Sequence, residues 1–80
     1  MKSFKISLND VTLVKEFVNL TGKIVGDVTL KSDRWVIDGK SIMGILSLDL
    51  RKELDCEIEA SESQIKIFED GLNNISQKSH

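Results

Sequence analysis

The 80-residue chain contains no proline, one cysteine (Cys56) and one histidine (His80). Without proline, its turns must rely on glycine, asparagine, aspartate and serine. A single cysteine excludes an internal disulfide, and it has no second cysteine with which to form a zinc site. Because the only histidine is residue 80, the rest of the chain has no imidazole for nucleophilic or acid–base chemistry. We therefore expect no metal and no cofactor.

Long apolar runs and a charge excess of one sign are also missing. The 11 basic and 13 acidic residues are interspersed and give a net charge of −2. No basic stripe is present, which argues against nucleic acid and against a membrane surface as partners. The apolar runs are far too short to span a bilayer. Residues 1–5 lack the apolar segment of a signal peptide, so we expect a cytoplasmic protein.

The length allows one domain, which we place at residues 1–80. A chain of this size buries only about 60% of its unfolded surface, so it can build one compact core. We expect a monomer or a weak dimer.

The first half of the chain predicts a strand, a helix and then two further strands. Residues 2–8 alternate apolar and polar side chains, which is typical of a half-buried strand. Asp10 is a good N-cap residue for a helix that runs to about residue 22. Strand character returns at residues 25–31 and again at residues 35–37, where we expect Trp35 to be partly buried at a sheet edge.

The second half predicts a short helix, a strand and a longer helix. The short helix covers residues 41–48, and the strand at residues 54–60 has the clearest alternation in the chain. This alternation places Cys56 on the buried side, as packing rather than as a nucleophile. The final helix begins after Ser61, and one apolar stripe lies along it: Ile65, Phe68, Leu72 and Ile75.

The predicted order is therefore β-α-β-β-α-β-α. Four short strands with one polar face each favour an antiparallel sheet that is covered on one face by the three helices. This arrangement is an α+β fold.

The short helix carries the candidate site. Ser41 stands at its start, where its hydroxyl can accept a hydrogen bond from a backbone N–H one turn later. The spacing predicts that Ile45 and Leu48 face the core and that Ile42, Met43 and Leu46 flank the helix. The alternative is that all five apolar residues close the core.

Residues Lys40-Ser41-Ile42-Met43-Gly44, followed by Ser47-Leu48, resemble the regulatory-serine segment of HPr, the histidine-containing phosphocarrier of the bacterial sugar phosphotransferase system. The resemblance implies an open-faced β-sandwich in which HPr kinase phosphorylates Ser41. It also implies that Lys40, Ile42, Met43 and Leu46 bind proteins of the phosphotransferase or carbon-regulation network, such as a transferase or a transcriptional regulator. Lys40 adjoins Ser41 and can pair with an added phosphate.

The phosphorylation motif of that family, Gly-Ile/Leu-His-Ala-Arg-Pro, has no counterpart here. The corresponding residues 8–14 contain no glycine, histidine, arginine or proline, and the loop is about three residues short. Without an imidazole nucleophile, transfer of phosphate from a phosphoenzyme is not expected. Asp10 is assigned to helix capping, because no metal cluster or partner lysine accompanies it. The sequence thus predicts a divergent member that lacks the phosphorylatable histidine, a regulatory or adaptor module rather than an enzyme.

Three other hypotheses remain open at this stage. The chain can be a decoy that occupies the partners of HPr without accepting phosphate. It can be a structural module that associates with itself through exposed sheet edges. A true phosphocarrier with another acceptor is the third, and the missing histidine argues against it.

Overall fold

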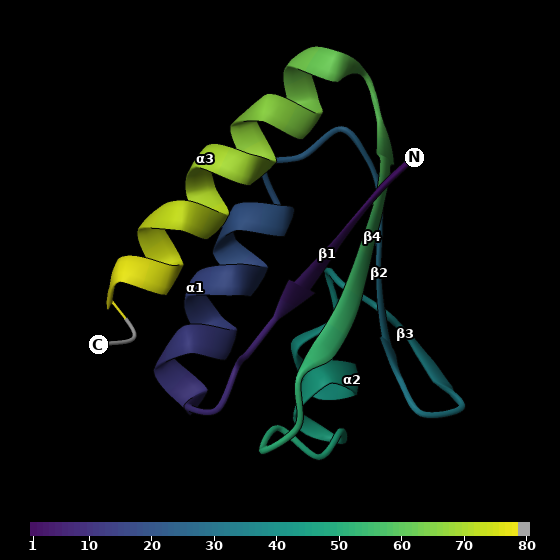
Figure 1. Cartoon of the computed structure of the whole chain (residues 1–80), viewed down its shortest axis with the longest axis vertical. Coiled ribbons are helices and arrows are strands. Elements are labelled where there is room, and N and C mark those ends of the chain that lie inside the picture. The colour runs from purple at the N-terminus through teal and green to yellow at the C-terminus, as the bar shows by residue number, and fades with distance from the viewer. Residues whose placement is uncertain (79–80) are drawn as a thin grey trace.

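The structure, a computed structural model, describes residues 1–78, with side chains described as far as Ile75. Seven elements follow in the predicted order (Figure 1). They are β1 (Lys2–Ile6), α1 (Val11–Thr21), β2 (Gly26–Ser32), β3 (Trp35–Asp38), α2 (Ile42–Leu46), β4 (Leu54–Ala60) and α3 (Glu62–Lys78). None of the helices in this part of the chain is long and apolar enough to cross a membrane.

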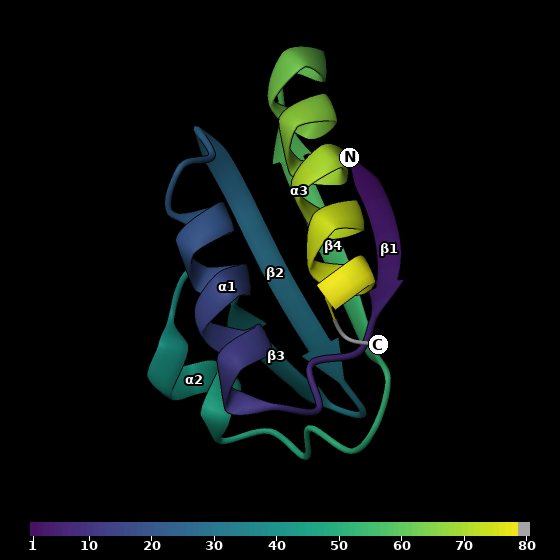
Figure 2. The same ribbon diagram turned by 90° about the vertical axis from the view of Figure 1, so that its left-hand side faces the viewer.

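The four strands form one antiparallel sheet in the order β1-β4-β2-β3. Strand β4 lies inside the sheet, where Cys56 is opposite Phe4 of β1 on one side and Leu30 of β2 on the other. Figures 1 and 2 show α1 and α3 packed on the same face, with α1 over β2. The other face of the sheet carries no helix from residues 1–78. The predicted α+β fold is confirmed.

The core fills the space between this sheet and the helices. Three phenylalanines join the layers, since the ring of Phe68 on α3 meets Phe4 of β1 at 5.7 Å and Phe17 of α1 at 6.1 Å, both edge to face. Alternation along β2 and β4 buries every second residue over most of the length of these two strands. The fully enclosed members include Val14, Leu30, Ile45, Leu54, Cys56 and Ile58.

Two predicted element ends differ from the observed ones by two residues, and the other predicted boundaries agree to within one residue. β1 ends at Ile6 instead of residue 8, because its partner β4 begins at Leu54, opposite Ile6, and no pairing continues beyond that point. α2 ends at Leu46 instead of residue 48. The next two residues close tighter turns, in which the N–H groups of Ser47 and Leu48 bond to carbonyls three residues back.

The prediction that Trp35 is partly buried is wrong. Its side chain is 62% exposed. Trp35 does lie at a sheet edge, but β3 has a neighbour on one side only and Trp35 is its first residue.

Candidate functional site

A tight turn leads from β3 into α2 and sets the position of Ser41. The Asp38 carboxylate accepts a hydrogen bond from the Lys40 N–H at 2.9 Å, and the Asp38 carbonyl accepts one from the Ser41 N–H at 3.0 Å. Gly39 donates its N–H to the carbonyl of Val28 at 2.7 Å. A Cβ at residue 39 would lie 2.6 Å from Val28 Cγ1, so this close approach requires glycine.

Ser41 caps α2, as predicted. Its backbone is extended (φ −102°, ψ 107°), and its Oγ accepts a hydrogen bond from the Gly44 N–H at 3.2 Å. Its carbonyl accepts the first helical hydrogen bond, from Ile45 at 3.1 Å. The residue is half-buried.

Packing against β3 holds α2, which at five residues is too short to be stable alone. The closest approach is at Gly44, where a Cβ would lie 2.7 Å from Ile37 Cγ2. Ile45 is fully buried and Leu48 nearly so, which confirms the predicted inner side.

The other apolar residues of α2 differ strongly in exposure. Met43 is 82% exposed and Leu46 is 44% exposed, whereas Ile42 is half-buried and packs against the core. Met43, two residues after Ser41, and Leu46, one turn further along, thus present apolar surface to solvent. We call Lys40, Ile42, Met43 and Leu46 the α2 surface.

The Lys40 ammonium is engaged away from Ser41. Its Nζ donates to the carbonyl of Ile24 at 3.0 Å and to that of Gly26 at 2.9 Å. Ile24 belongs to the connection between α1 and β2, and Gly26 is the first residue of β2. Lys40 therefore ties the start of β2 and the residues before it to the start of α2.

A buried threonine supports the same turn from α1. Thr21 Oγ1 lies 2.9 Å from the Gly39 carbonyl oxygen and 3.2 Å from that of Val18, and the residue has no exposed surface. Thr21 follows Val14 and Phe17 at helical spacing on the buried side of α1, but the sequence gives no sign of its partner. The available signal was a polar residue at an apolar position of the helix, because a buried polar side chain needs a hydrogen-bond partner.

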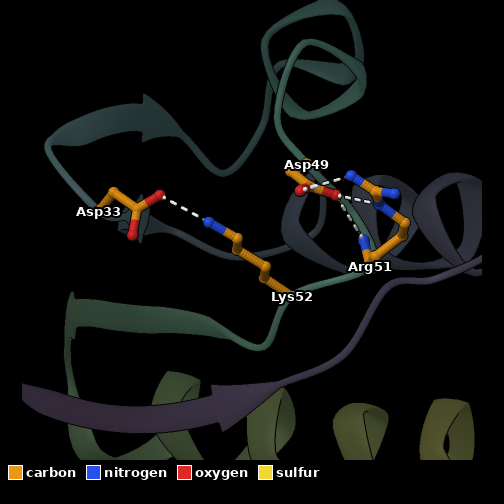
Figure 3. Close-up of polar contacts among 4 residues, drawn as sticks. All are labelled: Asp33, Asp49, Arg51 and Lys52. Atoms are coloured by element: carbon orange, nitrogen blue, oxygen red, sulfur yellow. Dashed lines mark hydrogen bonds and ion pairs between the residues drawn. The ribbon is translucent and has the colours of Figure 1, made fainter.

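Surface charge pairs fix the loop that follows α2 (Figure 3). Arg51 Nε and Nη2 contact the two carboxylate oxygens of Asp49 at 3.0 and 3.1 Å, and these bonds lower the pKa of Asp49. Lys52 Nζ lies 3.1 Å from the carboxylate of Asp33, which belongs to the turn before β3. These groups are well exposed, so the pairs orient the loop more than they stabilise the fold.

The residues that correspond to the histidine motif of the resembled family have a different chemistry. Asp10 Oδ1 accepts a hydrogen bond from the Thr12 N–H at 2.6 Å and caps α1, as predicted.

No group of three His, Cys, Asp or Glu side chains within residues 1–78 is arranged to hold a metal ion. His80 lies outside the described residues. Burial raises the pKa of the Cys56 thiol to about 12, so it stays a neutral packing group.

Comparisons with known proteins identify a family and a similar fold. A family model described as "PTS HPr component phosphorylation site" matches residues 12–75. The fold is similar to the crystal structure of HPr-C-His from Thermoanaerobacter tengcongensis, with a TM-score of 0.75, 24% sequence identity and 94% of each chain covered. A search of curated proteins finds no match.

Proposed function

Since the chain belongs to the HPr family of the phosphotransferase system, whose members are phosphocarrier proteins rather than enzymes, we propose that it is a divergent member acting as a regulatory or adaptor module. It binds protein partners through the α2 surface and carries no phosphohistidine. A phosphate on Ser41 regulates this binding. Its partners are cytoplasmic proteins of the phosphotransferase or carbon-regulation network, namely HPr kinase and a transferase or transcriptional regulator.

The observation that carries the proposal is the pairing of Ser41 with exposed apolar surface on one short helix. Ser41 caps α2, and Met43, two residues later, is 82% exposed. Exposed methionine suits protein recognition, because its flexible and polarisable side chain adapts to different partners. Leu46 extends this apolar surface by one turn.

The lack of a histidine relay is supported from two sides. The sequence has no histidine before residue 80. In addition, residues 8–14, which correspond to the histidine motif of the family, contain no glycine, histidine, arginine or proline. Asp10 in this segment uses its carboxylate to cap α1.

The regulatory step is a phosphoryl transfer to Ser41. The γ-phosphoryl group of ATP passes to Ser41 Oγ, the hydroxyl proton is released and ADP leaves. The product places a charge of about −1.5 to −2 beside Met43. An apolar partner surface then has to approach a strongly hydrated dianion, so binding through the α2 surface weakens.

Incubation with HPr kinase and ATP, followed by intact-mass analysis, tests the proposal. We expect one phosphate in the wild-type chain and in Ser47→Ala, and none in Ser41→Ala. Ser47 is the matched control, because it is an exposed serine at the other end of the same helix. A wild-type chain that stays unmodified while a standard HPr is phosphorylated in the same reaction would refute the role of Ser41.

A second measurement tests the α2 surface itself. Met43→Asp should abolish binding to whichever transferase or regulator the wild-type chain captures, because it places a charge at the centre of the apolar contact. Ile67→Asp is the control, since Ile67 is 48% exposed on α3, outside the α2 surface. Equal binding by both variants would show that partners dock elsewhere.

A further inference from the structure

The outer edge of β3 is less protected than that of β1. Both strands lie at the ends of the sheet. β1 carries two lysines along its five residues, of which Lys2 pairs with Glu69 of α3 and Lys5 pairs with Asp55 at 2.6 Å. Charged residues of this kind discourage pairing with another strand. β3 instead begins with two apolar residues, Trp35 and Val36, which are 62% and 63% exposed.

The backbone of β3 presents free pairing groups at this edge. In its ladder with β2, Gly39 donates to Val28 and Ile37 lies opposite Leu30. Because hydrogen-bonded pairs alternate in an antiparallel ladder, the odd-numbered residues of β3 turn their N–H and C=O groups toward β2. Val36 and Asp38 therefore turn theirs outward. The outward-facing Asp38 carbonyl already accepts a hydrogen bond from the Ser41 N–H, so Val36 supplies the N–H and the C=O that a second strand can pair with.

We propose that this edge pairs with β3 of a second copy of the chain, antiparallel, about a two-fold axis at Val36. In this register Val36 faces Val36 of the second copy, and each donates its N–H to the carbonyl of the other. The register uses only the outward-facing residues, so it leaves the β2–β3 ladder intact. The two four-stranded sheets join into one continuous sheet. This inference does not depend on the proposed function.

The charges along the edge fit a second copy. With Val36 opposite itself, Arg34 of each chain lies across from Asp38 of the other, which places an opposite-charge pair on each side of the axis. Arg34 is exposed and forms no ion pair with the residues that the structure describes. The same two residues thus meet twice, as a two-fold interface requires.

The apolar residues of the edge fit as well. Trp35 lies on the helix-covered side of β3 and faces Ile37 of the second copy in this register. Ile37 packs under α2 at Gly44 and is only partly buried. The pairing covers the exposed Trp35 ring and completes the burial of Ile37. Since β3 has only four residues, the contact is small and the dimer forms in a concentration-dependent equilibrium.

Sedimentation velocity of the full chain over a concentration series tests this proposal. We expect the average mass to rise from 9.0 kDa toward twice that value as concentration increases. Trp35 is the only tryptophan, so its emission should shift to shorter wavelength over the same range. A chain that stays at 9.0 kDa at every concentration contradicts the proposal.

Variants locate the interface. Val36→Lys places two lysines opposite each other on the axis, and Arg34→Glu places like charges opposite Asp38, so each should abolish the rise in mass. Ser3→Lys adds the same charge to the exposed face of β1 and should leave the dimer intact, as should Arg34→Lys. Circular dichroism verifies that each variant is folded. If Val36→Lys unfolds, Arg34→Glu, whose substitution lies in the hairpin turn, tests the interface by itself. A dimer that survives Arg34→Glu, or that is lost in Ser3→Lys, places the contact elsewhere and overturns the inference.

Discussion

The hydroxyl of Thr21 on α1 lies 2.9 Å from the carbonyl oxygen of Gly39, in the turn that leads into Ser41. This hydrogen bond is buried and joins residues 18 positions apart. It connects the end of the first helix to the start of the candidate site. The position of Ser41 therefore depends on the packing of α1 as well as on its own helix.

Replacement of Thr21 by valine should destabilise the protein by about 1–3 kcal/mol, because the isosteric side chain leaves the Gly39 carbonyl without its buried donor. Urea unfolding measures this loss. Thr29→Val is the matched control, since Thr29 lies on the uncovered face of β2, and we expect it to change stability by less than about 0.5 kcal/mol. Equal effects of the two substitutions would show that the Thr21–Gly39 bond contributes nothing.

Gly44→Ala should destabilise the protein by about 1–3 kcal/mol, because the new Cβ meets Ile37 Cγ2 at 2.7 Å and α2 must move away from β3. Gly71→Ala is the comparison. Its Cβ meets the end of the flexible Leu20 side chain, and alanine gains about 1 kcal/mol of helix propensity over glycine inside α3. Thermal unfolding should show a larger drop in Tm for Gly44→Ala. The reverse order would contradict close packing at α2.

Cys56 should make the protein less stable at high pH. Burial raises the pKa of its thiol from 9.0 to about 12 in the folded state. The unfolded chain therefore loses this proton first, so the stability that the neutral thiol contributes is complete below pH 9.0 and is lost as pH rises toward about 12.

The test for Cys56 compares the free energy of unfolding of the wild-type chain and of Cys56→Ala from neutral to alkaline pH. The variant is less stable at neutral pH because of the cavity it leaves. The gap between the two curves should narrow as pH rises. Parallel curves would show that the thiol titrates alike in both states.

The fold was largely predictable because strand alternation, helical spacing and capping residues all indicate the same secondary-structure elements. Alternation at residues 54–60 gave β4 its observed bounds, and Asp10 and Ser41 marked the starts of two helices through their capping chemistry. The predictions that were wrong depend on how distant segments of the chain pack together. The end of β1 depends on where β4 begins, and the exposure of Trp35 depends on the edge position of β3, neither of which is a local property.

The candidate site was predictable only in part. Helical spacing separated the inner residues Ile45 and Leu48 from the outer side of α2. The partners of Lys40 and Thr21 could not be foreseen, because they are backbone carbonyls brought close by the packing of α1 against the β3–α2 turn. Every residue type has a backbone carbonyl, so the sequence does not show which residue supplies the acceptor.

The absence of a histidine relay is the central claim, and phosphoryl transfer from phosphoenolpyruvate tests it most directly. The full chain is incubated with phosphoenolpyruvate and Enzyme I beside a standard HPr as positive control, and intact mass is read under conditions that preserve phosphohistidine. The account predicts a phosphorylated control and an unmodified chain, while HPr kinase and ATP still modify Ser41 in the same preparation. A chain that gains phosphate from phosphoenolpyruvate would contradict the account.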